Sequence, residues 1–150
     1  MITEEVKKYI KSSVLCWLAT SSKENIPNVS PKEVFTCFGE DALIIANIAS
    51  PQTVKNIKEN LNVCVSFIDV LVQKGLQIKG AAKIVKKGSP QYEEMENELI
   101  KITEGKFPFS SITKITIASI KPIIAPKYIS YPETTEKEQI ESALKAYKMK

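Results

Sequence analysis

Two residue types, histidine and arginine, are absent from this sequence of 150 residues, so its 21 basic residues are all lysines. Without histidine, the chain cannot form a zinc site with histidine ligands, a Ser-His-Asp or Cys-His nucleophile pair, or axial histidine ligation of haem. Without arginine, any anion site must use ammonium groups, hydroxyls and backbone N–H groups instead of a bidentate guanidinium. The two absences therefore exclude several large classes of enzyme before any motif is considered.

Cysteine is scarce and is never paired in a C-x-x-C motif. Cys16, Cys37 and Cys64 are widely separated and each lies within an apolar run, which predicts small buried side chains in a reducing compartment, not a metal or redox site. Long apolar runs are also missing, since residues 14–19 fall far short of the ~20 residues of a membrane span. The first five residues include two acids where a secretory signal carries basic residues. We therefore expect a cytoplasmic protein without a membrane-spanning segment.

The composition is that of an ordinary globular domain, with 43% hydrophobic and 25% charged residues. The net charge of +4 comes from scattered lysines, without the lysine and aromatic clusters typical of nucleic-acid binding. Nucleic acid is thus a permitted partner that nothing indicates. The length suffices for one sizeable core. We expect a single domain over residues 1–150, with a core at about 6–120 and a C-terminal extension whose helix spans about 135–148.

Hydrophobic patterning predicts a mainly β fold. Six strands are expected at residues 14–20, 28–38, 42–47, 63–70, 76–85 and 112–120, with the first three forming an antiparallel meander. Helix starts are expected at Thr3, at Ser50-Pro51, at Ser89-Pro90 and at a capping box that begins at Thr135. Tight antiparallel connections with helices between them predict a small β-barrel with helical plugs, not a parallel α/β sheet.

The segment from Asn47 to Asn56 is the first candidate for chemistry. A strand there leads directly into a helix whose first turn contains Ser50 and Thr53, with Lys55 nearby. Free N–H groups and the positive end of the helix dipole favour an anion at such a place. The same residues are equally typical of a plain helix cap, so spacing alone leaves both interpretations open.

Three motifs in register change this balance. The motifs are CWLAT followed by IPNVSPK (residues 16–20 and 26–32), SPQTVKNIKEN followed by VCV (50–60 and 63–65), and GLQIKGAA (75–82). In this order and spacing, over about residues 6–120, they resemble the FMN-binding split-barrel superfamily, which includes pyridoxamine 5'-phosphate oxidase-like proteins. The resemblance implies an antiparallel split β-barrel that binds FMN in a groove completed by a second subunit. It therefore implies a homodimer with FMN at the interface.

The same resemblance implies a set of cofactor-binding residues. The FMN phosphate would lie at the helix start near Ser50, Thr53 and Lys55, facing the strand of Ser30 and Lys32. Asn47 would lie beside the ring or the ribityl chain, and Gln52 stands where relatives often have lysine, which leaves one charge fewer for the phosphate. The whole candidate set is Ser30, Pro31, Lys32, Asn47, Ser50, Gln52, Thr53 and Lys55.

The implied function is that of an FMN-binding flavoprotein, either a flavin-dependent oxidoreductase or an electron-transfer protein of unknown substrate. Genuine pyridoxamine-phosphate oxidase activity is not expected, because the family's oxidases use arginine and histidine for the second phosphate-bearing substrate. Two alternatives stay open: a deazaflavin in the same fold, and a cofactor-free barrel that serves as a binding module, for example for nucleic acid. Trp17 is expected in the core, and Phe107 and Phe109 either staple a helix or cover the cofactor.

Overall fold

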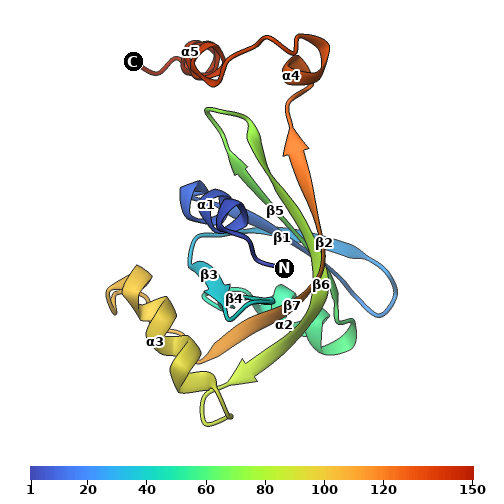
Figure 1. Cartoon of the computed structure of the whole chain (residues 1–150). Helices are drawn as coiled ribbons and strands as arrows, with labels where there is room; N and C mark the ends of the chain where they lie inside the picture. The colour runs from blue at the N-terminus through green and yellow to red at the C-terminus, as the bar shows by residue number, and fades with distance from the viewer.

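The computed structural model describes residues 1–150 and contains one seven-stranded, fully antiparallel sheet in the order β2-β1-β5-β6-β7-β4-β3. Figure 1 shows this sheet strongly curved, with α1 packed on it and α3 at one end. The strands are β1 (Cys16–Ser21), β2 (Pro27–Lys32), β3 (Phe35–Phe38), β4 (Ala42–Ala46), β5 (Asn62–Asp69), β6 (Lys74–Lys86) and β7 (Ser111–Ile124). The helices are α1 (Glu4–Ser12), α2 (Pro51–Glu59), α3 (Tyr92–Thr103), α4 (Pro126–Ser130) and α5 (Glu136–Ala146).

The prediction of a mainly β antiparallel fold is confirmed, but the expected meander is wrong. Residues 28–38 form two strands, and the break falls at Glu33 and Val34 instead of Pro31. β2 and β3 then lie at opposite edges of the sheet, β2 paired with β1 and β3 with β4. Pro31 is tolerated inside β2 because an edge strand can leave one side of its backbone without ladder hydrogen bonds.

Two hydrophobic clusters hold the helices on the sheet. The larger cluster joins Val6 and Ile10 of α1 to side chains from the inner face of the sheet. As expected, Thr3 caps α1, its Oγ1 accepting from the N–H of Val6 at 3.2 Å. The smaller cluster packs Met95 and Leu99 of α3 against β4 and β7.

The start of α3 differs from the prediction. The N-cap is Gln91, in the left-handed region at φ 66°, and not Ser89-Pro90. The carbonyl of Ser89 instead accepts from the N–H of Tyr92 at 3.2 Å, in a turn that precedes the helix. A Ser-Pro pair therefore begins a helix at α2 but not at α3.

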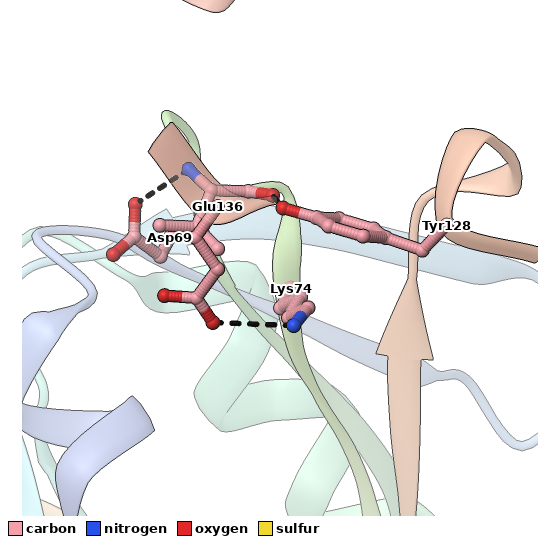
Figure 2. Close-up of polar contacts among 5 residues, drawn as sticks. Asp69, Lys74, Tyr128 and Glu136 are labelled. Carbon is pink, nitrogen blue, oxygen red and sulfur yellow. Dashed lines mark hydrogen bonds and ion pairs between the residues drawn. The ribbon is translucent and has the colours of Figure 1, made fainter. Parts of the chain in front are cut away.

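The C-terminal extension is fastened to the β5–β6 hairpin. α4 and α5 lie beyond that hairpin (Figure 1), and the capping box of Thr135 is present as predicted. Figure 2 shows the Lys74 ammonium 3.1 Å from the Glu136 carboxylate, while Tyr128 donates to the carbonyl of Val72 at 2.7 Å. The carboxylate of Asp69 accepts from the N–H of Val72 at 3.2 Å and so fixes the turn that Tyr128 grips. No helix of the chain has the length and apolarity needed to cross a membrane.

Two core predictions need correction. Cys16 is fully buried, but Cys37 and Cys64 are only half-buried. Trp17 is 45% exposed and does not belong to the core. Side chains alternate along β1, and because Cys16 and Leu18 point inward, Trp17 must point outward.

Candidate functional site

Lys32, the last residue of β2, is the one charged side chain among the buried residues, at 6% exposure. Its Nζ donates to the Oγ of Ser50 at 2.5 Å, and that hydroxyl donates to the carbonyl of Ile48 at 3.0 Å. Lys32 takes part in none of the ion pairs of the structure. Burial lowers the pKa of the Lys32 ammonium below its usual 10.5, with the Cys16 thiol opposing the shift. A buried cation held only by a hydroxyl is costly, and an anionic partner would remove that cost.

The start of α2 points hydrogen-bond donors toward the same place. Ser50 occupies the N-cap position but makes no side-chain cap bond. The N–H groups of the first turn have no intrahelical acceptor, and Pro51 contributes none. Ala49 turns the chain from the end of β4 into this helix in the left-handed region, at φ 50°. The helix therefore presents its positive end beside the Lys32 ammonium.

A chain of polar side chains fixes α2 against β1 and β2. Thr53 lies 3.2 Å from Ser30, hydroxyl to hydroxyl, and Asn56 donates to the hydroxyl of Thr20 at 3.0 Å. Thr53 and Asn56 are both buried, so the helix packs with a polar face instead of the expected apolar stripe. Leu61, expected in that stripe, is 53% exposed. Thr20 and Asn56 were missed as site-supporting residues, although both lie within the motifs noted above.

The structure brings four of the eight candidate residues together: Ser30, Lys32, Ser50 and Thr53. The amide of Asn47 is engaged elsewhere, donating to Ser111 at 3.1 Å and accepting from Thr113 at 2.8 Å. The amide of Gln52 runs along the helix and donates to Asn56 at 2.8 Å. Lys55 and Pro31 are exposed. Contact with a cofactor stays a prediction for all eight.

The comparisons with known proteins bear on this arrangement. A family model described as "Pyridoxamine 5'-phosphate oxidase" matches residues 2–122. The chain belongs to this family. No curated protein matches the chain.

Solved structures agree with this family assignment. HupZ from Group A Streptococcus is 26% identical, covering 82% of this chain and 100% of its own, with a TM-score of 0.71. An FMN-binding protein from Syntrophomonas wolfei subsp. wolfei is 18% identical, covering 81% and 86%, with a TM-score of 0.68. HutZ, the heme storage protein from Vibrio cholerae, is 16% identical, covering 82% and 94%, with a TM-score of 0.65. At such identities the last two show the split-barrel fold alone.

A cavity of about 280 Å³ adjoins the Lys32 side of the site in this family member. Its walls are mainly apolar, from Val34, Ala46, Ile48 and Phe107, and Lys32 and Glu33 supply its charges. Phe107 is 56% exposed and comes from the segment between α3 and β7. The cavity therefore offers a flat apolar group a place next to the cluster of donors, with Phe107 on one wall.

Proposed function

We propose that this family member binds FMN through its phosphate at the start of α2 and serves as a flavin-dependent oxidoreductase or electron-transfer protein. The observation that carries the proposal is Lys32, a buried ammonium in no ion pair, bonded to the N-cap serine of a helix. A phosphate there would meet the ammonium, the hydroxyls of Ser30 and Thr53, and the N–H groups of the first turn. These donors fit an anionic group without any guanidinium.

The protein's contribution would be binding and placement, because a bound flavin itself supplies hydride and electron transfer. Lys32 and Ser50 would fix one end of the cofactor, and the apolar walls beside Lys32 would keep water from its ring. The chain's lack of arginine and histidine argues against a second phosphate-bearing substrate held as in the family's oxidases. The substrate class is therefore expected to differ from theirs.

Haem is the less favoured ligand for this chain, although HutZ shares its fold. The sequence contains no histidine, so histidine cannot serve as the axial ligand. A deazaflavin that carries a phosphate would use the same donors as FMN and remains the closest alternative. A cofactor-free binding module leaves the buried charge of Lys32 without a counter-charge.

We also propose that a second copy of the chain covers the outer face around Trp17. Trp17 is 45% and Val29 59% exposed, and the residues opposite Trp17 on the neighbouring strands are Pro31 and Ser66. A large aromatic side chain among small ones on a flat sheet is typical of an interface. A two-fold dimer would bury the same patch on both subunits. Trp17→Glu should convert the dimer to a monomer in light scattering, and a wild-type monomer at micromolar concentration would contradict this proposal.

The experiment for the cofactor is a titration of purified protein with FMN, riboflavin, a phosphorylated deazaflavin and haemin, followed by absorption and fluorescence. Charge-assisted hydrogen bonds contribute roughly 1.5–3 kcal/mol, so FMN should bind on the order of ten to a hundred times more tightly than riboflavin, which lacks the phosphate. Equal affinities for FMN and riboflavin would refute the phosphate site. Tighter binding of deazaflavin or haemin than of FMN would replace FMN as the cofactor.

A further inference from the structure

A second cavity, of about 510 Å³, lies between α1, β3 and the C-terminal end of α3. This volume falls within the range of small-molecule sites, roughly 300–1,000 Å³. Glu33 lines both this cavity and the smaller one beside Lys32, so the two are neighbours across the linker between β2 and β3. None of the residues of the proposed phosphate site lines the larger cavity.

The walls of this cavity are apolar both at depth and at the mouth. Ile10 and Phe35 are buried at 5% and 6% exposure and belong to the main core. Val14 and Ile102, by contrast, are 82% and 44% exposed while lining the same cavity. Two aliphatic side chains exposed at the mouth of a cavity would lose water contact when an apolar body occupies it, which favours binding.

The charges around the cavity favour an anionic group at its α1 side. Lys7 and Lys11 are four residues apart on α1 and both line the cavity. The ammonium of Lys7 is bonded to Glu4 at 2.7 Å, whereas Lys11 is in no ion pair. Glu33 contributes a carboxylate from the β2–β3 linker, on a different wall. A carboxylate ligand would therefore turn toward Lys11 and away from Glu33.

We propose that this cavity binds a small organic carboxylate with an aliphatic or aromatic body. The carboxylate would pair with the Lys11 ammonium, and the body would lie between Ile10, Phe35 and the exposed side chains of Val14 and Ile102. This site is separate from the proposed phosphate site and does not depend on a bound flavin.

The chain contains its own reporter and control for this proposal. The thiol of Cys37 lines the cavity and is half-buried, whereas Cys64 is half-buried on β5 and lies outside it. Burial raises the pKa of both thiols, so both react slowly and are best compared at one fixed pH. The experiment measures the alkylation rate of each cysteine by N-ethylmaleimide, using peptide mass spectrometry, with increasing octanoate.

Octanoate should slow the alkylation of Cys37 at least fivefold in a saturable manner and leave Cys64 unchanged. Octylamine, which has the same chain and the opposite charge, should protect Cys37 much less. Lys11→Glu should abolish protection by octanoate, while Lys8→Glu, an exposed lysine on α1 that does not line the cavity, should retain it. Equal slowing of both thiols, equal protection by octylamine, or full protection in Lys11→Glu would overturn the proposal.

The same measurement separates this proposal from the cofactor proposal. Protein carrying Lys32→Met should still show octanoate protection of Cys37, because Lys32 does not line this cavity. Loss of flavin binding with retained protection would leave the carboxylate site standing, and the reverse result would leave only the flavin site.

Discussion

Replacing Lys32 by methionine is expected to change stability and cofactor affinity in opposite directions. Methionine has nearly the length of lysine and no charge, so it can fill the same space at the end of β2. The hydroxyl of Ser50 loses the hydrogen bond from Lys32 but keeps its own donation to Ile48 at 3.0 Å. No buried donor is therefore left without a partner, and the variant should fold.

The magnitudes follow from the burial of the ammonium. Replacing buried ionic groups by apolar ones of similar volume is often neutral or stabilising by about 1–4 kcal/mol. Because Lys32 keeps one hydrogen bond and 6% exposure, we expect the low end, about 1–2 kcal/mol for the apoprotein. In a chain of this length that corresponds to a rise in Tm of roughly 2–8 °C. FMN affinity should fall on the order of ten- to a hundredfold, since a charge-assisted hydrogen bond is lost.

The pH dependence supplies a second sign to check. The unfolded chain binds a proton at Lys32 up to its usual pKa of 10.5, whereas burial lowers the pKa in the folded apoprotein. Between these two values the unfolded state binds more protons, so the wild-type apoprotein gains stability as pH rises. The stability difference between Lys32→Met and wild type should therefore shrink as pH approaches 10.5.

The assay combines urea unfolding of both apoproteins at several pH values with titration by FMN and riboflavin. Lys58→Met provides the matched control, because Lys58 is an exposed lysine on the same helix, α2. The control should leave both stability and FMN affinity unchanged, and riboflavin should bind all three proteins alike. The reasoning is wrong if Lys32→Met destabilises the apoprotein and keeps full FMN affinity, since Lys32 would then be a structural residue.

Three further changes test other parts of the molecule. Thr53→Val removes a buried hydroxyl that lies 3.2 Å from Ser30, and should weaken FMN on the order of tenfold or more without changing riboflavin titrations. Gly75→Ala should destabilise the fold by about 2 kcal/mol or more in urea unfolding, because a Cβ there would lie 1.9 Å from the carbonyl oxygen of Phe67. Thr135→Ala removes the capping box of α5 and should speed amide exchange in that helix by about 1 kcal/mol equivalent, with little effect on exchange in the sheet.

The sequence predicted the elements better than their pairing. Period-two alternation along residues 76–85 and the apolar run at 42–47 are local signals, and both segments are strands in the structure. The partners of β2 and β3 depend instead on contacts far away in the chain. β4 pairs with β7, some seventy residues later, through Ala42↔Thr116 and Ala46↔Ile112. No turn signal reports that choice, so the consecutive meander was a natural but wrong expectation.

Within the site, helix geometry explains which candidate residues came together. Residues three or four apart share a helix face, so Thr53 and Asn56 both turn toward β1 and β2. Lys55 lies two positions from Thr53 and is therefore on the solvent side. Gln52 and Asn56 are four apart and bond to each other. The family motif marked the segment correctly, but the rotation of the helix decided which side chains face the strand of Lys32.

The absence of arginine gives this anion site a property that a guanidinium could not. An arginine stays charged at any pH a folded protein tolerates, so burying it would fix a permanent cost. A lysine can lose its proton, and burial lowers the pKa of Lys32 in that direction. An anion beside it would reverse the shift, because an opposite charge nearby favours the ammonium form. Phosphate binding at this site would then be accompanied by proton uptake at alkaline pH, which links the charge of the single buried lysine to occupancy of the site.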